Sequence, residues 1–146
     1  MAGGREVNYV IGNTVSGAFE DGLYMSDEVL ISRNSFFGNA QLGIDLPSDD
    51  DVNPGVTLND AGDGDSHLGN SLLNFPVITG ADGQAVTGTV CARCIVELFI
   101  SDDDPSGYGE GMEFLEDERA PGLGDFTIPI CGLGLEAGEE SRRQRR

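Results

Sequence analysis

The residues best suited to chemistry lie in an Asp- and Asn-rich stretch near the middle of the chain. Asp60, Asp63 and Asp65 are interleaved with glycines, and Asn59 and Asn70 stand beside them. Calcium binds about six to eight oxygen ligands, and a glycine-rich backbone allows several carboxylates to converge on one ion. The loop length and terminal Glu of an EF-hand are missing. The stretch therefore predicts a Ca2+ site made of these five residues, with a solvated acidic turn as the alternative.

Other polar groups are weaker candidates. The acidic clusters at 49–51 and 102–104 are typical of solvated turns, and His67 has no nucleophile in a recognisable motif beside it. Arg33 is the one basic residue inside the repeat described below. Aspartate is so abundant that paired carboxylates for glycoside hydrolysis carry no information. The sequence contains no recognisable active site, which favours a protein that is not an enzyme.

Three cysteines limit the redox chemistry. Cys91 and Cys94 form a C-x-x-C pair, and Cys131 stands alone. A structural zinc site needs four ligands, and no second pair completes one. A redox C-x-x-C normally opens a helix, whereas Cys94 runs into an apolar stretch that is typical of a strand. The favoured interpretation is a structural disulfide, between Cys91 and Cys94 or between one of them and Cys131. Free thiols are the first alternative, and metal or redox chemistry is the second.

Charge dominates the composition. The 146 residues include 26 acidic and 8 basic residues, for a net charge of −18. Such a surface repels nucleic acid and anionic membranes, and it suits cation binding or a salty environment. No apolar run approaches membrane-spanning length, and the first residues lack a signal-peptide core. We expect no nucleic-acid partner and no membrane span, and an exported chain would have lost its leader.

An internal repeat occupies the first part of the chain. An offset of 21 residues places Val10 over Ile31, Asn13 over Asn34, Val15 over Phe36 and Leu23 over Ile44. Repeats of this length match one coil of a parallel β-helix, in which inward side chains stack and corner asparagines form amide ladders. A leucine-rich repeat is disfavoured because the required leucines are missing.

The second half of the chain predicts short antiparallel strands. The stretches at 77–78, 86–90, 95–100 and 125–130 are apolar or alternate, and Gly, Pro and Asp turns separate them. Pro129 indicates an edge strand, because proline cannot donate to a sheet ladder. Strands at this spacing suggest a small antiparallel sandwich.

Several motifs follow one another in a characteristic order, at 13–17, 34–39, 43–46, 55–60, 69–77, 87–89, 96–99 and 107–111. This order resembles the terminal coils of right-handed parallel β-helix repeat proteins from bacterial and archaeal surfaces, followed by their β-sandwich module. The resemblance runs from about Val7 to Leu133. It implies an all-β fold with β-helix coils at 1–48, an acidic linker at 49–74, a sandwich at 75–134 and a tail at 135–146.

The same resemblance implies a function. Such proteins are secreted or attached to the cell surface, so we expect a calcium-stabilised, non-catalytic module for adhesion, for a stalk or for carbohydrate contact. Its partners would be polysaccharides or cell-surface glycans and the rest of the parent solenoid upstream. The alternative is the C-terminal fragment of a pectate-lyase-like lyase or hydrolase whose active coils lie upstream, because that fold is shared.

The end of the chain departs from the resemblance. The last six residues, 141–146, read Ser-Arg-Arg-Gln-Arg-Arg where a strand rich in Val, Thr and Ala would be expected. A GC-rich gene read one base out of frame gives such a run. Our hypothesis is a frameshifted tail, and a disordered basic tail is the alternative.

Overall fold

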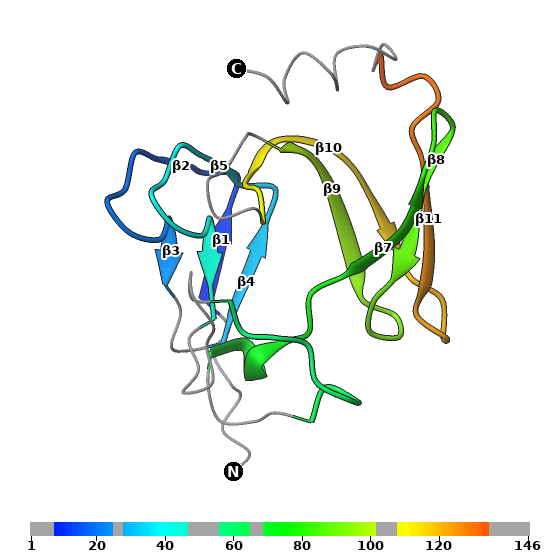
Figure 1. The fold of residues 1–146 in the computed structure, drawn as a ribbon, viewed down its shortest axis with the longest axis horizontal. Coiled ribbons are helices and arrows are strands. Elements are labelled where there is room, and N and C mark those ends of the chain that lie inside the picture. Colours follow the sequence, from blue (N-terminus) through cyan, green and yellow to red (C-terminus); the bar gives the residue numbers. More distant parts are fainter. Residues whose placement is uncertain (1–7, 25–27, 47–55, 65–68, 102–107, 135–146) are drawn as a thin grey trace.

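The chain folds into β-strands throughout the part that can be described. The computed structural model describes residues 8–24, 28–46, 56–64, 69–101 and 108–134 (Figure 1). Strands β1 to β11 and one short 3-10 turn account for the regular structure within these ranges. Figure 1 shows strands β9 and β10 between the parallel strands at one end and the antiparallel strands β7, β8 and β11 at the other. The expected all-β class is confirmed.

The first two repeats pair side by side. Three parallel pairs form: β1 (Asn8–Ile11) with β4 (Val29–Ser32), β2 (Thr14–Ser16) with β5 (Ser35–Phe37), and β3 (Leu23–Tyr24) with β6 (Ile44–Asp45). Val15 lies opposite Phe36, as the offset in the sequence predicts. The Asn13 side chain donates to Asn34 Oδ1 at 3.2 Å, so the expected amide contact is present. Phe36 is only 4% exposed and anchors this part of the chain.

The prediction of a right-handed parallel β-helix is wrong. The parallel strands form three separate two-stranded sheets, and the described residues contain no continuous solenoid sheet. The physical reason is that the outer edge of the second repeat does not meet a third repeat. Side chains of Asn70, Glu97 and Glu110 bond to its backbone instead, and the chain returns as antiparallel strands.

The antiparallel strands share one core. One sheet has the order β11 (Asp125–Pro129), β8 (Ala85–Thr89), β7 (Val77–Ala81), and the other pairs β9 (Ile95–Ser101) with β10 (Gly111–Arg119). Both sheets contribute to a buried cluster of Val86, Val96, Ala120, Phe126 and Ile128. Strand β11 lies at a sheet edge, which confirms the position predicted from Pro129.

The turn between β7 and β8 is closed by an aspartate. The Asp82 carboxylate accepts hydrogen bonds from the backbone N–H groups of Gln84 (2.8 Å) and Ala85 (3.0 Å). The bond from Gln84, and then that from Ala85, lower the pKa of Asp82 below its ordinary value of 3.8, because both favour the charged form. The turn is therefore stabilised above pH 3.8, and this contribution is lost as the pH falls through the lowered pKa.

A glycine fixes the packing between two loops of the antiparallel part. Gly124 has a φ of +87°, and a Cβ on it would lie 2.1 Å from the carbonyl oxygen of Val90. The same two residues are joined by a bond from Val90 N to Gly124 O of 2.9 Å. Replacement of Gly124 therefore forces the two loops apart.

We expect Gly124→Ala to lower the free energy of unfolding by about 2 to 3 kcal/mol, from left-handed backbone strain and the lost close approach. Urea denaturation measures this loss. Gly122→Ala in the same loop is the matched control, since a Cβ there meets nothing within 4 Å. Equal losses in both variants would contradict the steric explanation.

Candidate functional site

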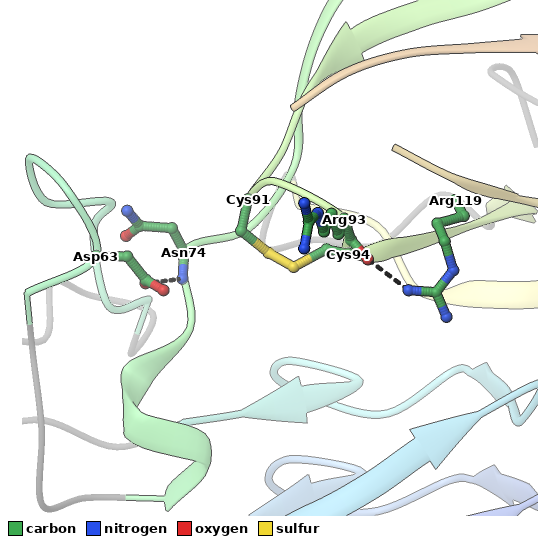
Figure 2. Close-up of a disulfide and its surroundings, with 6 residues drawn as sticks. All are labelled: Asp63, Asn74, Cys91, Arg93, Cys94 and Arg119. Atoms are coloured by element: carbon green, nitrogen blue, oxygen red, sulfur yellow. Dashed lines mark hydrogen bonds between the residues drawn. A yellow bond between two sulfur atoms is a disulfide. The ribbon is translucent and has the colours of Figure 1, made fainter. Parts of the chain in front are cut away.

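The structure brings part of the expected calcium site together around Asn74. Asp63 Oδ1 accepts a hydrogen bond from Asn74 N at 2.8 Å (Figure 2). Asn74 Oδ1 accepts one from Asp60 N at 2.9 Å. Asn59 exchanges two bonds of 2.8 Å with the backbone of Phe75. Three of the expected ligands therefore lie against one short segment, and their polar atoms fasten the acidic loop to it.

Asp60 has one oxygen that this network does not use. Its Oδ2 accepts a hydrogen bond from Gly64 N at 3.0 Å, which closes the loop on itself. Its Oδ1 is buried and has no hydrogen-bond partner within the part of the chain that the structure describes. A buried carboxylate oxygen is costly to leave unpaired, so it is suited to a ligand that is not a protein group.

The other two expected ligands lie elsewhere. Asn70 bonds to the edge of β4, because its Oδ1 accepts from Val29 N at 2.8 Å and its Nδ2 donates to Val29 O at 3.0 Å. Asp65 falls outside the described residues, as do His67 and the two other acidic clusters. Among the residues with a described position, no three His, Cys, Asp or Glu side chains gather as a metal site would require.

A hollow of about 440 Å3 adjoins the acidic loop. Its lining includes Asn59, Asp63 and Phe75, and also Thr89 and Cys91 from the end of β8 and the loop that follows. The hollow therefore offers amide, carboxylate and aromatic groups to a ligand beside the C-x-x-C motif. No sequence pattern indicates this hollow, because its walls come from segments about 30 residues apart in the chain.

Cys91 and Cys94 form a disulfide in the loop between β8 and β9 (Figure 2). Their Cα atoms are 5.5 Å apart. Cys131 is exposed and free, and its N–H bonds to Gln84 O at the opposite end of β8. Of the pairings that the sequence left open, the structure contains the one within the C-x-x-C motif.

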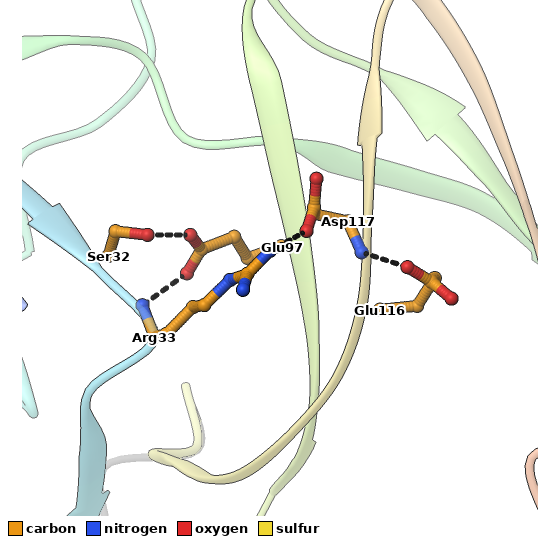
Figure 3. A network of polar contacts seen from close by, with 5 residues as sticks. All are labelled: Ser32, Arg33, Glu97, Glu116 and Asp117. Atoms are coloured by element: carbon orange, nitrogen blue, oxygen red, sulfur yellow. Dashed lines mark hydrogen bonds and ion pairs between the residues drawn. The ribbon is translucent and has the colours of Figure 1, made fainter. Parts of the chain in front are cut away.

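A polar network joins the second repeat to the β9–β10 sheet (Figure 3). The Glu97 carboxylate accepts hydrogen bonds from the Ser32 hydroxyl and, at 2.8 Å, from Arg33 N. Arg33 Nη2 pairs with Asp117 Oδ1 at 2.6 Å, and the guanidinium lies 4.8 Å from the Phe114 ring centre. Arg33 therefore has structural contacts at a junction between two parts of the chain.

A buried carboxylate, that of Glu110, also bonds to the second repeat. Glu110 is 2% exposed, and it accepts hydrogen bonds from Asn39 N (2.9 Å) and from the Asn39 side chain. Asn39 in turn accepts a bond from Ala18 N at 3.0 Å, in the first repeat. Glu110 is thus connected through one asparagine to both repeats.

Sequence reasoning missed Glu97 and Glu110. They lie 64 and 71 residues from the backbone groups that they bind, so no local pattern marks them. No signal in the sequence sets them apart, because other carboxylates such as Glu113 and Glu116 also lie in strands.

Comparison with known proteins adds no identification. No protein-family model, no curated protein and no solved structure matches this chain. The resemblance to β-helix repeat proteins therefore has no support from family comparison, in agreement with the separate sheets of the fold. Within the described ranges, no helix is long and apolar enough to cross a membrane.

Proposed function

We propose that this chain is a non-catalytic module of an exported surface protein, which acts in adhesion, as a stalk or in contact with carbohydrate. Its β9–β10 sheet would cover the edge of the second repeat, where unpaired strand groups invite aggregation. In this proposal the surface of the folded module performs the function, and no side chain takes part in a chemical reaction.

One observation carries this proposal. The carboxylates of Glu97 and Glu110 bind backbone N–H groups of the second repeat. In a glycoside hydrolase such groups would flank a scissile bond instead. The lyase or hydrolase alternative places its active coils upstream of this chain, and no contact in the described residues favours it.

Export is supported by the disulfide. Disulfides persist mainly in secreted proteins and at cell surfaces, because the cytosol keeps thiols reduced. The Cys91–Cys94 bridge therefore suits an oxidising compartment. The strongly acidic composition also suits a surface in contact with salt and divalent cations.

Polysaccharide binding together with cell fractionation tests the function. We expect the purified chain to be retarded in gels that contain a neutral or acidic polysaccharide, with no new reducing ends and no unsaturated products. Antibodies should detect the native protein in the surface or secreted fraction. Release of reducing ends or unsaturated products would overturn the non-catalytic assignment, and a purely cytosolic protein would overturn export.

We also propose that the acidic loop binds Ca2+, with Asp60 as the central ligand. The support is the buried Asp60 Oδ1 that has no hydrogen-bond partner in the described part of the chain. Asp63 bonds to Asn74, the residue that also bonds to Asp60, and Asp65 follows Asp63 in the sequence. Because the amide oxygens of Asn59 and Asn74 already accept hydrogen bonds from backbone N–H groups, water would supply the remaining oxygens.

We expect Ca2+ to raise the melting temperature by several degrees, since a ligand at about 100 times its Kd stabilises the native state by about 2.7 kcal/mol. The isosteric variant Asp60→Asn should abolish this rise. Asp125→Asn, which removes an exposed charge from β11, should keep it. Differential scanning calorimetry with Ca2+, Mg2+ or chelator measures the melting temperatures of the parent and the two variants. If NaCl of matched ionic strength raised the melting temperature by the same amount, the loop would be a solvated acidic turn and not a Ca2+ site.

A further inference from the structure

Positive charge gathers at the Cys91–Cys94 disulfide of this acidic chain. Arg93 lies inside the bridged loop, and Arg119 Nη1 donates to the carbonyl oxygen of Arg93 at 2.8 Å. That carbonyl belongs to the peptide bond between Arg93 and Cys94, so the second guanidinium lies beside the Cys94 end of the bridge (Figure 2). Both arginines are exposed. Cations next to a cysteine favour its thiolate over its thiol.

The loop has backbone hydrogen bonds of its own besides the disulfide. The bridge spans a sequence separation of only 3, and a disulfide that closes so short a loop restricts the unfolded chain least. Backbone hydrogen bonds hold the same loop: Cys94 N to Cys91 O (3.2 Å), Val90 N to Gly124 O (2.9 Å), Ala120 N to Cys94 O (2.9 Å) and Arg93 N to Pro121 O (3.3 Å). The loop can therefore keep its conformation when the two sulfurs are reduced.

Access to the bridge is from the hollow beside the acidic loop. Cys91 and Ala92 line this hollow together with Asp63 and Phe75. Cys91 is half-buried and lines this hollow, so the hollow is the side from which we expect a small thiol to approach. Cys94 lies at the other end of the bridge, next to the two arginines.

From this arrangement we propose that Cys91–Cys94 is a thiol–disulfide exchange site that accepts two electrons from a dithiol. A thiolate of the dithiol attacks Cys91 Sγ from the hollow, the Cys91–Cys94 bond breaks, and Cys94 leaves as a thiolate that then takes a proton. The second thiol of the donor attacks the mixed disulfide and releases Cys91. The donor ends as a cyclic disulfide, and the protein ends with two thiols.

The arginines have a definite role in this step. An exchange reaction is faster when the leaving thiol has a lower pKa. Arg93 and Arg119 favour the departing Cys94 thiolate, and neutral replacements remove that help. This inference goes beyond the surface-module function, and its test uses the purified oxidised chain, so it succeeds or fails independently of export and glycan binding.

Dithiothreitol is the dithiol probe, and Cys131→Ser is the background that removes the one other thiol. We expect one equivalent of oxidised dithiothreitol to form per chain, as measured by its absorbance. The far-ultraviolet circular dichroism spectrum of the protein should stay unchanged. In this background Arg93→Gln/Arg119→Gln should slow the exchange by about threefold. Arg93→Lys/Arg119→Lys keeps both charges and should stay close to the parent rate.

Three results would overturn the proposal: no oxidised dithiothreitol, loss of the β-sheet spectrum on reduction, or equal rates in the Gln and Lys variants and the parent. The second result would make the bridge a structural one. The third would remove the role of charge, and with it the reason to assign exchange to this loop. Melting curves of the oxidised variants show that each is folded before the rates are compared.

Discussion

Replacement of Glu110 by Ala should lower the free energy of unfolding by about 3 to 5 kcal/mol. The side chain is 2% exposed and accepts hydrogen bonds from the backbone and the side chain of Asn39. Truncation leaves both donors buried without this acceptor, and each bond to a charged group is worth about 1.5 to 3 kcal/mol. Because Asn39 also binds the first repeat through Ala18, the loss extends across both repeats.

Chemical denaturation of three variants tests whether the lost hydrogen bonds of Glu110 cause this fall in the free energy of unfolding. Glu113→Ala is the matched control from the adjoining strand β10, because Glu113 is exposed, and we expect it to stay within about 0.5 kcal/mol of the parent. Glu110→Gln keeps the shape but turns an acceptor into a donor, so its stability should fall between the two. If Glu110→Ala lost no more than Glu113→Ala, the buried carboxylate would not hold the repeats to the β9–β10 sheet.

The repeat could be predicted from sequence because it is a local property. Residues of the same type recur at the same offset, so they adopt the same backbone and pair in register, as Val10 does with Ile31. The amide contact between Asn13 and Asn34 follows from the same regularity. The number of strands in each sheet does not follow from it. That number depends on what covers the second repeat, and the covering groups come from distant segments.

Strand β10 is the element that sequence pattern did not predict. Its pairing with β9 has register irregularities between Gly111 and Glu113 and between Phe114 and Glu116. Each irregularity shifts the alternation of inward and outward side chains, so the period of two that marks a strand is lost. Glu110 directly precedes this strand, and it was missed because the backbone group that it binds lies 71 residues away in the chain.

The expected calcium ligands were predicted as a group because Asp and Asn are clustered in the sequence. Composition does not tell which oxygen is already bonded. Asn70 has the right chemistry, but its amide pairs with the backbone of Val29 in the manner of a neighbouring strand. Asp60 is distinguished from Asp63 by one buried oxygen, a property that only the folded chain defines.

The second large effect is expected at the centre of the antiparallel core. Ile128 is 0% exposed, pairs with Val86 across the β11–β8 ladder and belongs to the cluster with Val96 and Phe126. Ile128→Ala removes buried apolar atoms and leaves a cavity that both sheets border. We expect a loss of about 4 kcal/mol, near the upper part of the range for such truncations. A domain of this size is stable by about 5 to 15 kcal/mol, so the variant should be close to the limit of folding.

The same truncation at Ile78 is the matched control, since Ile78 lies in the same sheet but is 62% exposed. Ile78→Ala should lower the free energy of unfolding by no more than about 1 kcal/mol, because folding removes little of the Ile78 side chain from water. Urea denaturation compares the two variants, and an unchanged slope shows that only stability has changed. Ile128→Val, which removes one methylene, should lose about 1 kcal/mol. If Ile128→Ala and Ile78→Ala lost the same amount, the two sheets would not share a core at Ile128.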